Sequence, residues 1–150
     1  MRLAIRLLAS LVLLSAVGSS AAFAEKKGCS QDLMRQAEAA TDSLKSWELV
    51  YEFYQKFARC DDGGVAEGVS DGVAKLFADH WGSVAEFVTI ANSDKNFEKF
   101  VLRHVDSTID FEHDAPKIRE NARLHCPVNL TSLCKDLLTR AATPRDMGPR

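Results

Sequence analysis

Ser70 stands at the centre of the stretch GVSDG, residues 68–72, which matches the G-x-S-x-G nucleophile motif of α/β-hydrolases. Such a serine attacks an acyl carbon after a histidine takes its proton and backbone N–H groups bind the oxyanion. The motif works at a sharp strand-to-helix turn that exposes the hydroxyl. Residues 60–67, CDDGGVAE, are not a buried strand. We keep a small serine hydrolase using Ser70 as an alternative that burial in a regular helix would exclude, and we assign no catalytic residue.

The histidines and cysteines do not form a recognisable metal-binding pattern. Neither H-E-x-x-H nor C-x-x-C occurs in the chain. His104 lies on an apolar helix face, where a hydrogen-bonded core histidine is the favoured interpretation. His104, Asp106 and Ser107 are the residue types of a catalytic triad, but neighbours at one helix end point in different directions. We therefore expect no metal and no cofactor.

Carboxylates gather in two short stretches of the chain, near residues 61–71 and 111–114. We assign six of them to a candidate binding surface: Asp61, Asp62, Glu67, Asp71, Glu112 and Asp114. A calcium loop would need side-chain oxygens where Gly63 and Val65 stand. We expect Asp61 or Asp62 to cap a helix. If the two stretches are close in space, they form an acidic surface for a basic protein partner.

Cys29, Cys60, Cys126 and Cys134 allow three disulfide pairings. A helical hairpin of residues 30–41 and 46–59 would bring Cys29 and Cys60 together at its open end. Cys126 and Cys134 can close locally only if residues 126–130 are not helical, because eight helical residues separate two Cα atoms by about 12 Å. We favour Cys29–Cys60 with Cys126–Cys134.

Residues 1–24 have the pattern of a secretory signal peptide. Arg2 and Arg6 precede an apolar run over residues 7–17, and Ala-Phe-Ala at 22–24 resembles a cleavage site. The run is too short for an ordinary membrane span, and no cysteine near the junction would carry a lipid anchor. We predict a bacterial, periplasmic or secreted protein without a membrane span after cleavage.

The charge balance excludes some partners. The chain has 19 basic and 21 acidic residues, and loss of Arg2 and Arg6 leaves a formal net charge of −4. That charge argues against nucleic acid or an anionic membrane as the main partner. The 126 remaining residues suit one domain with a single core.

Apolar residues repeat with a helical period along nearly all of the mature chain, and no segment alternates like a strand. Residues 47–58 carry the clearest apolar stripe, with charged residues opposite. We predict an all-α, disulfide-braced, single compact bundle of about six or seven short helices over residues 25–140. Residues 141–150 are predicted to be a flexible tail.

Gly64, Gly68 and Gly72 share one helix face if this stretch is helical. Missing side chains would let a neighbour approach closely, and we expect Trp47, Tyr51 or Trp81 there. The alternative is a frayed helix start in which Gly63 and Gly64 belong to the loop.

In size, export and helical disulfide architecture, the chain resembles small exported all-helical proteins of bacteria, some of which neutralise toxins from competitors. The resemblance transfers no functional residue. We predict a non-enzymatic binding or inhibitory protein, most concretely an immunity protein against a cell-envelope toxin with a basic surface. A periplasmic chaperone or envelope structural factor, with an exposed apolar groove, is the main alternative.

Overall fold

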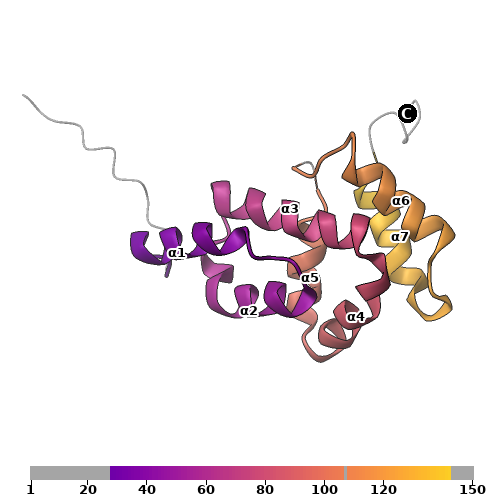
Figure 1. Ribbon diagram of the computed structural model, residues 1–150. Coiled ribbons are helices and arrows are strands. Elements are labelled where there is room, and N and C mark those ends of the chain that lie inside the picture. Colours follow the sequence, from indigo (N-terminus) through magenta and orange to yellow (C-terminus); the bar gives the residue numbers. More distant parts are fainter. Residues whose placement is uncertain (1–27, 107, 143–150) are drawn as a thin grey trace, which may run out of the picture.

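A computed structural model describes residues 28–106 and 108–142, and this part of the chain is helical with connecting loops and no strand (Figure 1). Its α-helices are α1 (Gln31–Thr41), α2 (Trp47–Phe57), α3 (Gly63–Asp79), α4 (Val84–Ser93), α5 (Lys95–Arg103), α6 (Asp114–Leu124) and α7 (Thr131–Arg140). Its short 3-10 segments are η1 (Ala58–Cys60), η2 (Trp81–Ser83) and η3 (Val128–Leu130). The predicted all-α bundle with about six or seven short helices is confirmed.

Two predictions fall wholly or partly beyond these residues. The predicted signal peptide, residues 1–24, lies outside the described part, and so do residues 143–150 of the predicted tail. Ala141, which we assigned to the tail, is buried, and its carbonyl oxygen accepts a hydrogen bond from Arg119 Nη1 at 2.8 Å. Ordered packing therefore continues to at least this residue.

Short polar side chains begin four of the helices. The Ser30 and Ser46 hydroxyls accept hydrogen bonds from backbone N–H groups in the first turns of α1 and α2. At the start of α3, the Asp62 side chain accepts a hydrogen bond from the Gly63 N–H, and Asp62 is one of the two residues predicted to cap a helix. The Asp94 side chain accepts hydrogen bonds from two backbone N–H groups of α5. Each cap satisfies donors that the first turn of a helix leaves unpaired.

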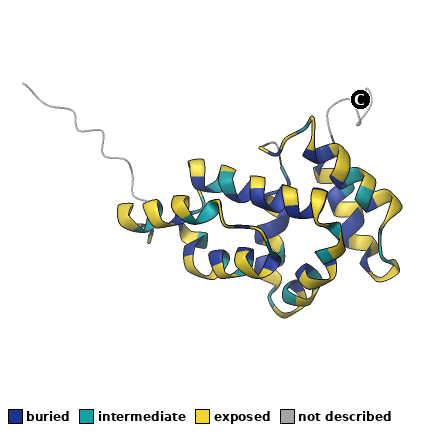
Figure 2. Ribbon diagram, in the orientation of Figure 1, coloured by how far each residue is buried: buried dark blue, intermediate teal, exposed yellow. Residues whose placement is uncertain are grey.

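Helix α3 is the axis of the bundle. It packs against α1 and α2 on one part of its surface and against α6 on another (Figure 1). More than half of its residues are buried, and the buried faces of the surrounding helices turn inward toward it (Figure 2).

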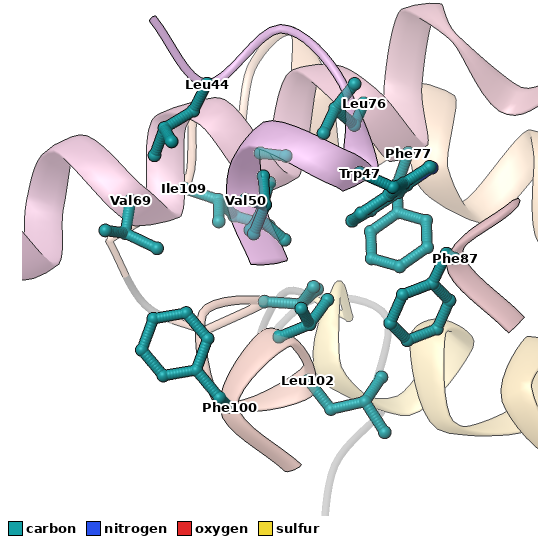
Figure 3. Packing of buried hydrophobic residues seen from close by; sticks show 14 of the residues in the cluster. Leu44, Trp47, Val50, Val69, Leu76, Phe77, Phe87, Phe100, Leu102 and Ile109 are labelled. Atoms are coloured by element: carbon teal, nitrogen blue, oxygen red, sulfur yellow. The ribbon is translucent and has the colours of Figure 1, made fainter. Parts of the chain in front are cut away.

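Aromatic side chains fill the centre of the core. The Trp47 ring centroid lies 4.7 Å from that of Phe77 and 4.9 Å from that of Phe87 (Figure 3). The Trp47 indole N–H donates to the Ser83 hydroxyl at 3.0 Å, so its one polar group is satisfied. Apolar groups from α2, α3 and α4 thus meet at one point.

Two of the three spaced glycines lie where another part of the chain comes close to α3. A Cβ built on Gly68 would lie 2.7 Å from Thr41 Cβ, and one built on Gly72 would lie 2.8 Å from Leu44 Cβ. The close approach was predicted, but its expected aromatic partners were wrong, because Trp47 turns toward Phe77 and Phe87 instead. Gly64 is helical, yet a Cβ there would meet nothing within 4 Å.

Both favoured disulfides are present. Cys29–Cys60 joins the residue before the α1 cap to the end of η1, with the Cα atoms 5.2 Å apart. Cys126–Cys134 spans 6.1 Å between Cα atoms, because α6 ends at Leu124 and the chain turns before α7. Each such link typically stabilises a small domain by about 2–4 kcal/mol.

The glycine contacts predict opposite effects for equivalent substitutions. Gly68→Ala and Gly72→Ala should each lower the free energy of unfolding by about 1–3 kcal/mol, because the new methyl group overpacks the contact. Gly64→Ala is the matched control. It should not destabilise the protein, and the higher helix propensity of alanine should raise the free energy of unfolding by up to about 1 kcal/mol. Urea unfolding of the three variants measures this, and equal effects at all three positions would contradict the packing described.

Candidate functional site

A buried polar network connects three elements inside the core. Ser70 lies in the middle of α3, His104 caps the C-terminus of α5, and Asp61 follows η1. Ser70 Oγ is 3.0 Å from His104 Nδ1, and His104 Nε2 is 3.3 Å from Asp61 Oδ1. Ser70 is 1 % exposed and His104 is 3 % exposed. A serine, a histidine and an aspartate are therefore in series, in contact with one another.

The placement of this series differs from that of a hydrolytic triad. Ser70 is inside a regular helix and buried, whereas a nucleophile elbow exposes its serine at a strand-to-helix turn. The nitrogen facing Ser70 is Nδ1 and the one facing Asp61 is Nε2, the reverse of the arrangement in serine proteases. This is the geometry that we expected to exclude Ser70 as a nucleophile. His104 is the hydrogen-bonded core histidine that its apolar face predicted.

Asp61 is also bound from the surface side by a cation. Arg103 Nη2 donates to Asp61 Oδ2, and the Asp61 side chain is only 6 % exposed. Burial alone would raise the pKa of the Asp61 carboxyl, but the contact with His104 and the charges of His104 and Arg103 outweigh burial, so its pKa lies below the usual value. The ionised carboxylate is the form that the folded protein stabilises.

The lowered pKa of Asp61 predicts an acid-sensitive contribution to stability. A carboxyl with a depressed folded-state pKa stabilises the fold above its unfolded pKa, about 3.9, and loses that contribution as the pH falls through the folded value. Asp61→Asn should therefore lower stability at pH 7 and flatten the loss of stability below about pH 4.

Ser70→Ala provides the control for this prediction. It leaves Asp61 and Arg103 in place but removes the hydroxyl partner of His104, which should cost about 1–3 kcal/mol while keeping the acid dependence. Thermal unfolding from pH 2 to pH 8 distinguishes the two variants. The same acid dependence in Asp61→Asn and in the parent would show that Asp61 does not contribute it.

A second group of side chains forms an acidic face on α3, the loop before α6 and the first residue of α6. We define the acidic face as Asp71, Asp79, Asp110, Glu112 and Asp114. Burial raises the pKa of Asp114, and the charges of Asp110, Asp79 and Asp71 raise it further. Asp71 of the first acidic stretch and Asp114 of the second are therefore close enough to interact.

Two lysines partly neutralise this face. Lys75 Nζ is 2.6 Å from Asp71 Oδ2, and Lys117 Nζ is 2.7 Å from Asp79 Oδ1. Asp110 Oδ1 accepts hydrogen bonds from the backbone N–H groups of His113 and Glu112, which hold its pKa below the usual value. The carboxylates outnumber the lysines, and the face retains a negative charge.

The six residues assigned to a binding surface have different environments. Asp62, Glu67, Asp71 and Glu112 are exposed. The Asp61 and Asp114 side chains are buried, so they contribute to the local field rather than to a contact surface. The sequence did not reveal Asp79 and Asp110 as members of the face. Their alignment with Asp71 and Asp114 arises only when the loop packs beside α3.

Comparison of the chain with protein-family models, with curated proteins and with solved structures finds no match. Within residues 28–106 and 108–142, no helix is long and apolar enough to cross a membrane. Over the same residues, no group of three histidine, cysteine or acidic side chains is arranged to hold a metal ion.

Proposed function

We propose that this protein acts by binding, as an exported inhibitory protein whose most concrete form is immunity to a cell-envelope toxin. The observation that carries the proposal is the acidic face, whose exposed carboxylates are Asp71, Asp79, Asp110 and Glu112. Lys75 and Lys117 pair with two of these four carboxylates. A surface of one sign of charge speeds association with a partner of the opposite sign and disfavours other partners. The expected partner is a protein with a basic surface.

The scaffold beneath the face supports this use. The face is built on α3, which is fixed by close contacts at Gly68 and Gly72. A disulfide at each end of the described bundle adds further restraint. A surface that is already ordered loses little conformational freedom on binding, which favours affinity. Export is proposed from the predicted signal peptide and is in keeping with paired cysteines.

The chaperone alternative requires a broad exposed apolar surface. Over the described residues, the large apolar side chains that are exposed are Leu49, Leu124 and Val128. Leu49 lies on α2, far along the chain from the other two, so the three do not make one continuous helix face. This distribution favours specific recognition.

The proposed function predicts charge-dependent capture of a partner. The native protein, used as bait on an envelope extract of its own host, should recover one polypeptide in stoichiometric amount, and added salt should weaken the capture. Asp71→Lys with Glu112→Lys should reduce affinity for this polypeptide about tenfold or more. The polypeptide should be toxic when exported alone and harmless when co-produced with this protein.

The matched control is Glu48→Lys with Glu86→Lys, which changes the net charge equally. These exposed residues lie on α2 and α4, away from the loop before α6 (Figure 1). The control should bind like the parent. An equal loss of affinity for the captured polypeptide in both double variants would refute recognition through the acidic face. Recovery of no stoichiometric partner would refute it as well. A partner that is harmless when exported alone would refute the immunity form of the proposal.

A further inference from the structure

The two disulfides of the protein lie in different surroundings. We call Cys29–Cys60 the core bridge, because both of its cysteines are buried. We call Cys126–Cys134 the peripheral bridge, in which Cys134 is buried but Cys126 is only partly buried. Thiol–disulfide exchange begins when a thiolate reaches one sulfur of a disulfide, so accessibility limits its rate. Cys126 is therefore the residue at which exchange can begin in the folded protein.

The two bridges also differ in how much structure must move to open them. The core bridge precedes Asp61, which contacts His104 inside the core, so its opening separates buried segments. The peripheral bridge links two residues eight positions apart, in the connection between α6 and α7 at the edge of the molecule (Figure 2). Val128 and Asn129 of this connection are exposed. Exposed connections open at a lower free energy than core segments do.

Other contacts hold the connection between α6 and α7 independently of the peripheral bridge. The Trp81 indole N–H donates to the His125 carbonyl oxygen at 3.0 Å, just before Cys126. Leu130 is buried, and its N–H donates to the Pro127 carbonyl oxygen at 2.9 Å. Helices α6 and α7 also pack against each other. We therefore expect the protein to remain folded when the peripheral bridge is reduced.

The surroundings of the peripheral bridge favour release of a thiolate. His125 precedes Cys126 and Lys135 follows Cys134, and both of these basic residues are exposed. Residues 121–135 contain no carboxylate side chain. Cys134 is the fourth residue of α7, a ten-residue helix that begins without a side-chain cap. Positive charge and the N-terminal end of a helix both stabilise a nearby thiolate.

We propose that the peripheral bridge is an exchange site that accepts electrons from a protein dithiol of the Cys-x-x-Cys class. A thiolate of that protein attacks Cys126 Sγ, and the electron pair of the broken S–S bond leaves on Cys134 Sγ. The second thiolate of the dithiol then attacks the mixed disulfide and releases the Cys126 thiolate. The dithiol is oxidised to a disulfide, and the two cysteines take up the two protons that it loses.

A dithiol is the expected reagent because Cys134 remains close to the mixed disulfide. Its thiolate re-forms the original bridge unless a second thiol of the reagent competes at high effective concentration. A dithiol supplies that second thiol within the same molecule, whereas a monothiol must wait for a second collision. This exchange is independent of the proposed binding function, and its test needs no captured polypeptide.

The rates of reduction of the two bridges provide the first test. The native protein is incubated with reduced thioredoxin at pH 7, free thiols are alkylated at intervals, and the labelled cysteines are mapped by mass. The peripheral bridge should open at least about tenfold faster than the core bridge, with an unchanged helical circular dichroism signal. Glutathione at equal thiol concentration should reduce it at least about tenfold more slowly. Equal rates for the two bridges, or equal rates with the two reagents, overturn the proposal.

Trapping of the mixed disulfide provides the second test. Thioredoxin with its second active-site cysteine changed to serine cannot complete the exchange, and acid quenching should preserve its adduct with Cys126. An adduct at Cys134 or on the core bridge, or no adduct, overturns the proposal. Cys126→Ser with Cys134→Ser is the matched control, which retains only the core bridge. It should melt at a lower temperature than the parent and form no adduct below that temperature, and an adduct there also overturns the proposal. The mapping on the parent does not depend on this variant.

Discussion

The fold depends on one buried polar contact, in which His104 stands between Ser70 and Asp61. Polar groups in a core are costly unless each has a partner, and loss of one partner leaves the others unsatisfied. This contact ties His104, at the C-terminal end of α5, to Ser70 in the middle of α3 and to Asp61, which follows Cys60. Because Cys60 is bonded to Cys29, the start of α1 is tied to the same point. The start of α1, the turn that leads from η1 into α3, and the end of α5 are thereby held in one arrangement.

Helix α3 connects this buried contact to the surface of the protein. Gly68 and Gly72 allow α1 and the following connection to approach its backbone, while Ser70 points to the other side, toward α5. Asp71 and Asp79 lie on its exposed side, where they meet the loop that begins α6. One helix therefore supplies a close packing surface, an internal hydrogen bond and part of the acidic face. Its Ser70 is buried within a regular helix, unlike the exposed serine of a nucleophile elbow.

The helices and the disulfide pairing could be predicted because they depend on local spacing. The apolar period indicates helices, and the predicted helical hairpin of residues 30–41 and 46–59 brings Cys29 to Cys60. The limited reach of a disulfide then allows Cys126–Cys134 if the chain between them is not one continuous helix. The burial of Asp61 could not be predicted in this way. It stands beside Asp62 in a polar turn, and its partners, Arg103 and His104, are more than forty residues later. The contacts of Gly68 and Gly72 were misassigned for the same reason, since spacing shows that a neighbour comes close but not which one.

We propose that the Ser70, His104 and Asp61 series is structural and that the protein works through its surface. The most direct test is to treat the native protein with a fluorophosphonate that labels activated serines and to measure its intact mass. Because Ser70 is 1 % exposed within α3, we predict no added mass on the folded chain. One equivalent of label on Ser70, blocked by prior unfolding or by His104→Ala, would contradict this account.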